Sequence, residues 1–162
     1  MRDTTLCFLV ESFNDQITSV LLAMKKRGFG ANWYNGVGGK VNEGEDILTA
    51  ACRETFEEIT VVVNSSDLTK VALLKFEFPD NPEWDQFVHV YVVEKWEGEP
   101  RESEEMKPEW FSTNSVPLEK MWPDDKFWLP QVLAGKKIDA YFKMDKNNNI
   151  LAQEVKEVAI LV

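Results

Sequence analysis

The segment GKVNEGEDILTAACRETFEEITV, residues 39–61, joins a glycine-containing loop to a stretch with the spacing of an acidic helix. Glu54, Glu57 and Glu58 lie at positions i, i+3 and i+4, so a helix places their carboxylates on one side. The chain contains one His and two Cys, and a carboxylate cluster in such a chain favours a hard, oxygen-preferring cation such as Mg²⁺. Because Mg²⁺ held by carboxylates usually shares its ligands with substrate phosphates, the segment indicates phosphate-ester or phosphoanhydride chemistry.

A helix over residues 46–59 is predicted to bury one face and to present its acids on another. At about 100° per residue, one stripe collects the side chains expected in the core. They are Leu48, Ala51, Cys52, Thr55 and Ile59. Arg53 and the three glutamates fall outside this stripe. An ordinary solvated, glutamate-rich surface is the alternative interpretation of E-x-x-E-E taken by itself.

The full spacing of this segment resembles the Nudix box, G-x5-E-x7-R-E-U-x-E-E-x-G-U, in which U is an aliphatic residue. The matching positions are Gly39, Glu45, Arg53, Glu54, Glu57, Glu58 and Val61. Thr55 stands where an aliphatic residue is usual, and Thr60 stands where glycine is usual. A helix commonly ends in a left-handed residue, which favours glycine. A β-branched residue there costs roughly 1–2 kcal/mol, so we expect a different helix exit at Thr60.

Length and composition indicate a single domain that spans residues 1–162. The chain has 162 residues, of which 44% are hydrophobic, enough for a sizeable core. The net charge of −10 argues against a nucleic acid polymer as a partner, because such binding depends on Lys and Arg that neutralise phosphates. It does not exclude a single nucleotide whose phosphates arrive with metal ions.

The sequence also indicates a cytoplasmic monomer. We find no secretory signal and no apolar run near the ~18 residues that span a membrane, so no membrane association is expected. Cys7 and Cys52 both fall in apolar segments, and we expect two buried thiols in a reducing compartment.

Strand patterns and a second helix follow along the chain. Apolar and β-branched runs bounded by turn residues predict strands at 6–11, 19–25, 68–78, 87–96, 109–112, 138–144 and 150–158. Asp124 or Asp125 is expected to cap a helix that reaches about residue 133, with Pro130 limiting or kinking it. This mixture predicts an α+β domain. With the resemblance, the expected architecture is the Nudix fold, a mixed β-sheet sandwiched between α-helices.

Further motifs are similar to the oxidised purine nucleoside triphosphatase (8-oxo-dGTP diphosphatase) branch of the Nudix hydrolases. They are MKKRGFG at 24–30, NG at 35–36, GGKV at 38–41, FEF at 76–78, EEM at 104–106, WF at 110–111 and MWPDD at 121–125. The similarity covers nearly the whole chain. It implies an enzyme that hydrolyses a damaged purine nucleoside triphosphate to the monophosphate and pyrophosphate, and so sanitises the nucleotide pool.

A purine requires a flat apolar slot and polar groups at its edge. The residues expected to form the slot are Phe29, Phe76, Phe78 and Trp122, and those expected at the edge are Asn35, Asp124 and Asp125. Phe76 and Phe78 alternate along a strand and therefore share a face. The alternative for these aromatic residues is that they are plain core.

Asp124 and Asp125 are predicted to share a proton. Adjacent acids in a partly apolar site repel each other, so we expect one to stay protonated near neutral pH. The pair then offers both a donor and an acceptor, which suits oxidised guanine as well as oxidised adenine. The alternative is that one of the two acids merely caps the following helix.

The resemblance also implies a metal site. Glu54, Glu57 and Glu58 would bind one to three Mg²⁺ ions, or Mn²⁺ in their place, with Glu54 and Glu58 as the most direct ligands. The carbonyl of Gly38 would join them, and Glu105 would act as a metal ligand or base. Attack is implied at the base-proximal phosphorus, with release of pyrophosphate.

Three basic residues are expected near this site. Arg53 is expected to orient the acids and to pair with Glu45. Lys25 and Lys40 are candidates for phosphate contacts, and exposed surface lysines are the alternative. His89 lies in an apolar strand pattern and is expected to be structural.

Two differences from the branch leave the preferred purine lesion open. Tyr34 stands where the branch usually has Trp. The loop over residues 80–87 is lengthened, so that Gln86 or Phe87 occupies the place of a pocket-lining Met. The alternatives for function are a Nudix pyrophosphatase acting on another nucleoside diphosphate derivative, or a catalytically silent nucleotide-binding module.

Overall fold

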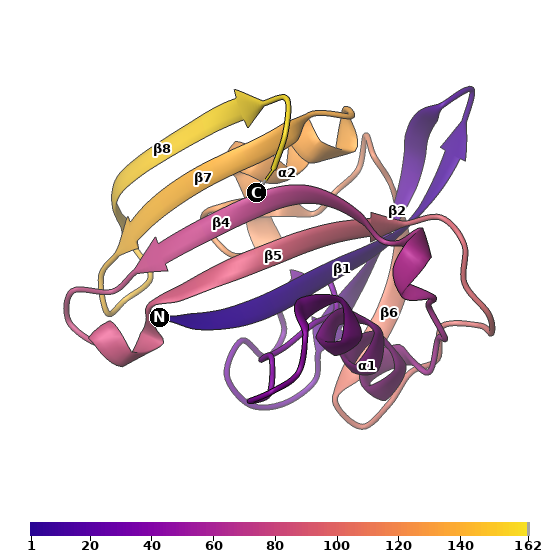
Figure 1. Cartoon of the computed structure of the whole chain (residues 1–162), viewed down its shortest axis with the longest axis horizontal. Coiled ribbons are helices and arrows are strands. Elements are labelled where there is room, and N and C mark those ends of the chain that lie inside the picture. Colours follow the sequence, from indigo (N-terminus) through magenta and orange to yellow (C-terminus); the bar gives the residue numbers. More distant parts are fainter. Residues whose placement is uncertain (162) are drawn as a thin grey trace.

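In the computed structural model, which describes residues 1–161, a mixed β-sheet carries an α-helix against each face (Figure 1). The strands are β1 (Arg2–Phe13), β2 (Gln16–Lys25), β3 (Tyr34–Asn35), β4 (Thr69–Glu77), β5 (Gln86–Val93), β6 (Met106–Ser112), β7 (Lys137–Met144) and β8 (Ile150–Val158). The helices are α1 (Ile47–Ile59) and α2 (Asp125–Leu133), and the short 3-10 turns are η1 (Ser65–Asp67), η2 (Pro82–Trp84) and η3 (Leu118–Lys120).

The sheet combines parallel and antiparallel pairs. Over the described range the strand order is β3-β2-β1-β5-β4-β7-β8, and β6 pairs with β2 along its other edge. β1 is parallel to β5, and β4 is parallel to β7. The other pairs are antiparallel. The expected α+β architecture, a mixed sheet between helices, is therefore confirmed.

The apolar run in β1 joins the two hydrophobic cores on either side of the sheet. In a strand, successive side chains point to opposite faces. Leu6 and Phe8 therefore pack in the cluster that contains Trp128 of α2. Cys7, between them, packs in the cluster that contains Ala51 of α1. Both helices are thus fixed to the same strand.

The predicted strands are present, with differences at their ends. β1 and β2 extend further into their hairpin, where Asn14 and Asp15 both adopt the positive φ of a tight turn. β6 begins earlier than predicted, at Met106, and β5 ends earlier, at Val93. β3 was not predicted, because two residues carry no alternation that a pattern can detect.

The buried face of α1 differs from the predicted stripe. Leu48 is exposed and Cys52 is half-buried, whereas Ala50 and Glu58 are buried. The predictions for Leu48 and Glu58 are therefore wrong, whereas Cys52 packs against the core as predicted but is only half-buried. A helical stripe assumes one flat core, but α1 also packs against the glycine loop, where Glu58 accepts a hydrogen bond from Gly38.

The exit of α1 also differs from the prediction. Thr60 adopts the left-handed conformation, with φ 59° and ψ 31°, and its N–H donates to the carbonyl of Phe56 at 2.9 Å. The helix therefore ends as it would at glycine, and the expected alternative exit is wrong. Val61 is fully buried directly afterwards, so its packing offsets a backbone cost of about 1–2 kcal/mol.

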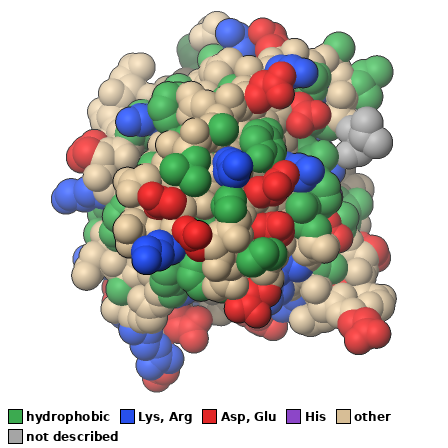
Figure 2. All heavy atoms as spheres, turned by 90° about the vertical axis from the view of Figure 1, so that its left-hand side faces the viewer, with side chains coloured by type: hydrophobic (Ala, Val, Ile, Leu, Met, Phe, Trp, Pro, Cys, Tyr) green, Lys and Arg blue, Asp and Glu red, His purple; other side chains and the backbone are tan. Residues whose placement is uncertain are grey.

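The surface mixes charges of both signs. On the face shown in Figure 2, acidic and basic side chains are interspersed with hydrophobic ones. Across residues 1–161, neither helix has the length and apolar character required to traverse a membrane. Cys7 and Cys52 are both free thiols, and burial raises the pKa of Cys7 to about 12.

Candidate active site

The glycine loop is attached to β1 by backbone hydrogen bonds. Cys7 and Val37 exchange N–H···O bonds of 2.6 and 3.0 Å, and the N–H of Thr5 donates to the carbonyl of Gly39 at 2.9 Å. A Cβ atom at Gly38 would lie 1.9 Å from the carbonyl oxygen of Thr5. A side chain at position 38 would therefore force the loop away from the strand.

Arg53 binds three acidic side chains next to the end of this loop. Its Nε and Nη2 donate to the two carboxylate oxygens of Glu45 at 2.8 and 3.0 Å, which confirms the predicted pair. Its Nη1 donates to Glu54 at 2.9 Å and to Glu57 at 3.2 Å. A further bond of 3.0 Å reaches the carbonyl of Lys40. The guanidinium thereby ties α1 to the glycine loop and fixes the direction of its acids.

Glu58 is a buried carboxyl whose protonation depends on its acidic neighbours. Its Oε1 accepts the N–H of Gly38 at 2.7 Å, and its residue is 8% exposed. Burial raises the pKa of Glu58 to about 7, and the negative charges of Glu54 and Glu105 contribute to the rise. The three acids therefore share one electrostatic environment that a cation would relieve.

The glutamates of α1 differ in their exposure to solvent, which bears on the alternative of a solvated acidic surface. The side chains of Glu54 and Glu57 are 17% and 55% exposed. The interpretation as a solvated surface is therefore correct for Glu57, but it is wrong for Glu54 and Glu58. Of the three helix glutamates, Glu54 and Glu58 therefore point into the structure and not into bulk water.

The donor set fits a hard cation in its chemistry. Every candidate ligand is an oxygen, the donor type that Mg²⁺ prefers. The carboxylate of Glu54 lies close against the loop, since an added Cβ at Gly39 would be 2.6 Å from it. Across residues 1–161, no group of three or more His, Cys, Asp or Glu side chains is arranged so that it could hold a metal ion. Glu54 is engaged by Arg53 and Glu58 by the Gly38 amide.

Glu54, Glu57 and Glu58 of α1 are called the acid cluster below. A cavity of about 510 Å³, which we call the aromatic cavity, adjoins this cluster at Glu58. It is lined by all the residues predicted to bind substrate: Lys25, Phe29, Asn35, Phe76, Phe78, Trp122, Asp124 and Asp125. Gly38, Lys40 and Glu58 also line it, so the cavity and the acid cluster meet at Glu58. In the described chain Arg53, Glu54, Glu57 and Glu105 lie outside this lining.

Aromatic rings supply the flat walls of this cavity. Trp122 contacts two rings of the loop after β2, Phe29 at 5.3 Å and Trp33 at 5.1 Å between centroids. Phe76 is 9% exposed and lies 5.4 Å from Phe142. Phe76 therefore belongs to the core and to the cavity wall at once.

Asp124 and Asp125 lie at the start of α2 and are both buried. Asp124 accepts a hydrogen bond from Trp128 Nε1 at 2.8 Å. Asp124 occupies the N-cap position of α2, as predicted, but its side chain makes no capping bond within the described residues. Asp125 Oδ2 has no hydrogen-bond partner in residues 1–161. Burial raises the pKa of both carboxyls, and the charge of Asp124 raises that of Asp125 further.

Several cavity residues were missed by sequence reasoning. They are Arg2, Trp33, Trp84, Met106 and Asn148, which come from five separate segments. The Nε of Arg2 is buried without a hydrogen-bond partner among residues 1–161. Together with Asp125 Oδ2 it is therefore one of two unpaired polar atoms in residues that line the cavity. The sequence offered one signal, the unusual loop that contains Trp84.

Of the two differences from the resembled branch, the one at Gln86 lies in the cavity wall as expected and the one at Tyr34 does not. Tyr34 is absent from the cavity lining of residues 1–161, and its ring packs edge-on against Phe111 at 5.1 Å. Its neighbour Trp33 lines the cavity instead. Gln86 lines the cavity, whereas Phe87 points to the opposite face of β5 by strand alternation.

His89 lies on the α1 side of the sheet, outside the cavity lining found in residues 1–161. Its ring nitrogens contact Asp3 and Lys70, each at 2.9 Å. Burial lowers the pKa of His89. This arrangement agrees with the structural role expected for it.

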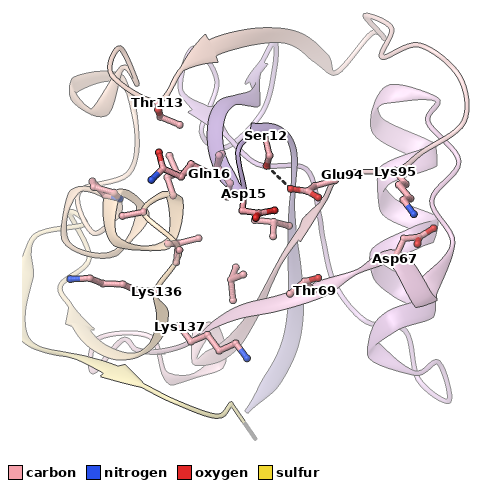
Figure 3. Close-up of a pocket in the computed structure, with 18 of the residues that line it drawn as sticks. Ser12, Asp15, Gln16, Asp67, Thr69, Glu94, Lys95, Thr113, Lys136 and Lys137 are labelled. Atoms are coloured by element: carbon pink, nitrogen blue, oxygen red, sulfur yellow. Dashed lines mark hydrogen bonds between the residues drawn. The ribbon is translucent and has the colours of Figure 1, made fainter.

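A larger hollow of about 820 Å³ lies at the opposite end of the sheet (Figure 3). Figure 3 shows Ser12 bonded to Glu94 within it, with Lys95, Lys136 and Lys137 around the rim. Its acidic and basic groups are mixed, and the residues of the acid cluster and the aromatic cavity are absent from its described lining. The smaller cavity, which adjoins the carboxylates, is therefore the candidate active site.

The fold and this site define an α+β protein in which a carboxylate cluster opens into an aromatic cavity. A model of the NUDIX domain matches residues 1–132. The oxidized purine nucleoside triphosphate hydrolases of Mus musculus and Danio rerio are each 45% identical over 139 residues, covering 86% of this chain and 87% of theirs. The crystal structure of the MutT protein from Bacillus halodurans superposes with a TM-score of 0.79 at 24% identity, over 96% of this chain and 98% of that one. The chain belongs to the Nudix family.

Proposed function

We propose that this Nudix hydrolase converts oxidised or otherwise modified purine nucleoside triphosphates, of the 8-oxo-dGTP and 2-hydroxy-dATP type, to the monophosphate and pyrophosphate. The observation that carries the proposal is the buried Asp124–Asp125 pair in a cavity that Glu58 also lines. A purine recognised there has its phosphates directed along the cavity toward the acid cluster. The names of the relatives from mouse and zebrafish support the same substrate class.

The aspartate pair reads the edge of the base. Asp125 has a raised pKa and an unpaired Oδ2, so it is suited to donate a proton to a base acceptor. Asp124, which already accepts from Trp128, is suited to accept a second bond. Movement of the proton between the two lets the site take an oxidised guanine or an oxidised adenine.

Glu54, Glu57 and Glu58 would hold Mg²⁺ or Mn²⁺, joined by the Gly38 carbonyl and Glu105. When bound, the metal supplies charge neutralisation for the triphosphate and lowers the pKa of water. Glu105, whose charge raises the pKa of Glu58, is a candidate to take the proton of the attacking water.

The remaining side chains position the reacting groups. Arg53 keeps Glu54 and Glu57 directed to one place, and Lys25 and Lys40, which line the cavity, would contact the phosphates of a bound substrate. Water adds to the base-proximal phosphorus, the bond from that phosphorus to the bridging oxygen breaks, and pyrophosphate leaves with that oxygen.

The charge and the thiols of the chain bear on its partner and its compartment. The net charge of −10 and the mixed charges in Figure 2 support a small nucleotide as the partner and disfavour a nucleic acid polymer. Two free thiols support a reducing compartment, the cytoplasm. One connected sheet in the described residues supports a single domain over residues 1–162, and we propose that this domain works as a monomer.

The test is pyrophosphate release in Mg²⁺ from 8-oxo-dGTP, 2-hydroxy-dATP, O6-methyl-dGTP, dGTP, dATP and ADP-ribose. We expect kcat/KM for a modified purine to exceed that for dGTP. The control Glu58→Gln keeps an oxygen that can accept the Gly38 N–H, so it should fold while kcat drops at least about a hundredfold. Preference for ADP-ribose, or turnover of none of these compounds by folded protein, would refute the proposal.

A further inference from the structure

We propose that Trp84 is a specificity-determining residue. Its indole forms the wall of the aromatic cavity at the connection between β4 and β5, and it limits the size of the group that a bound base carries on that side. The inference rests on the proposed function and adds to it a residue that selects among modified purines.

The loop that carries Trp84 is fixed by its own hydrogen bonds. Trp84 is the last residue of η2, and its N–H donates to the carbonyl of Asn81 at 2.9 Å. The carboxylate of Asp85 accepts the N–H of Phe78 at 2.7 Å, and the N–H of Asp85 donates to the carbonyl of Pro82 at 3.1 Å. The backbone at Trp84 is therefore held in one conformation.

The indole ring is held as well. It packs edge-on against Phe78, with centroids 5.8 Å apart and an interplanar angle of 82°. With the Asn81 amide oriented so that both its ends are satisfied, Trp84 Nε1 donates to the side-chain oxygen of Asn81 at 3.0 Å and the Asn81 nitrogen donates to Glu83 at 2.8 Å. Because the indole N–H is already satisfied, Trp84 offers a ligand an apolar surface and no free donor.

The position of the Trp84 indole explains why it would limit the size of a substituent on the bound base. Trp84 lines the same cavity as Phe78 and the aspartate pair. A base held at its edge by Asp124 and Asp125 cannot shift away from a fixed wall without losing those bonds. Apolar pockets discriminate a misfit of one methylene by about tenfold or more.

The experiment compares Trp84→Leu and Trp84→Phe with wild type and with Trp110→Leu. Trp110 is a matched control because it is 37% exposed, like Trp84, but packs against Trp96 away from the cavity. The substrates are 8-oxo-dGTP, 2-hydroxy-dATP, N6-methyl-dATP, O6-methyl-dGTP and O6-ethyl-dGTP, with kcat and KM measured separately.

We expect Trp84→Leu to raise kcat/KM for at least one alkylated purine by about tenfold relative to 8-oxo-dGTP. The change should appear in KM, because the wall contacts the base and not the reacting phosphorus. Trp84→Phe should lie between Trp84→Leu and wild type, and Trp110→Leu should match wild type. Asn81→Ala removes the partner of the indole N–H and should raise the same ratio of kcat/KM values. It tests the role of Trp84 if Trp84→Leu does not fold.

Two negative outcomes are distinguishable. If wild type hydrolyses modified purines but no ratio changes in the folded Trp84 variants or in Asn81→Ala, the role of Trp84 is refuted and the proposed function stands. If wild type hydrolyses none of the modified purines, the proposed function is refuted, and this inference with it.

Discussion

At the scale of single residues, Asp125 combines a stability cost with a proposed role in recognition. Burial raises its pKa well above the usual value, and the charge of Asp124 adds to the effect. A carboxyl with a raised pKa in the folded state contributes stability below its unfolded pKa of about 3.9. That contribution is lost as the pH rises toward the folded pKa.

We therefore expect Asp125→Asn to melt at a higher temperature than wild type at pH 7, with the difference shrinking toward pH 4. The same variant should lose discrimination between modified and ordinary purines, because the amide cannot exchange a proton with Asp124. Thermal melts from pH 4 to 8 check the first expectation and a substrate panel the second. Asp80→Asn, which removes an exposed charge outside the cavity lining of residues 1–161, is the control. Unchanged base preference in both Asp124→Asn and Asp125→Asn would remove the shared-proton hypothesis.

At the scale of elements, two adjacent glycines in the loop have different reasons to be glycine. A Cβ at Gly38 would lie 1.9 Å from a backbone oxygen of β1, which cannot move without the sheet. A Cβ at Gly39 would lie 2.6 Å from the carboxylate of Glu54, the movable end of a side chain. The first contact therefore concerns folding and the second concerns the site.

We expect Gly38→Ala to destabilise the protein severely. Gly39→Ala should change the free energy of unfolding by within about 1 kcal/mol and still reduce Mg²⁺-dependent turnover, because Glu54 must leave its position. Urea denaturation and steady-state kinetics on both variants make the comparison. Equal stability of the two variants, or full activity in Gly39→Ala, would contradict this division.

The exit of α1 provides a second prediction at this scale. Thr60 has φ 59°, a conformation that L-residues with branched side chains adopt at a cost of about 1–2 kcal/mol. Glycine removes this cost but loses more backbone entropy. We expect Thr60→Gly to raise the free energy of unfolding by about 1 kcal/mol in urea titrations. Thr69→Gly, at the exposed start of β4, should lower it by about 0.5–1 kcal/mol, and a loss of stability in Thr60→Gly would show that the threonine side chain is needed there.

The same element shows how far sequence reasoning reaches. The period of α1 is a local property, so the sequence predicts a helix over residues 46–59 where the structure has Ile47–Ile59. Asp46 is its capping residue and accepts the N–H of Thr49 at 2.8 Å. The burial of Glu58 is not local, because the partner that covers it is the loop around Gly38. A helical stripe cannot contain that information.

At the scale of the whole molecule, the acid cluster and the aromatic cavity meet because parallel pairing of β1 with β5 brings distant segments together. The aspartate pair and Phe78 could be predicted, because both lie in sequence motifs that the chain shares with the resembled branch. Arg2, Trp33 and Trp84 were missed, because their place in the cavity wall depends on which strands lie side by side. No spacing along the chain encodes that neighbourhood.

The sharing of β1 by both cores leads to a prediction about unfolding. Leu6 and Phe8 pack on the α2 side and Cys7 on the α1 side, so neither core can open without exposing the other face of the same strand. Small domains built this way unfold in one cooperative transition. We expect far-UV circular dichroism and tryptophan fluorescence to give coincident urea curves, since Trp128 reports the α2 core and Trp96 packs beside the α1 core. Two separated transitions would show that the cores fold independently and would overturn the proposal of a single domain.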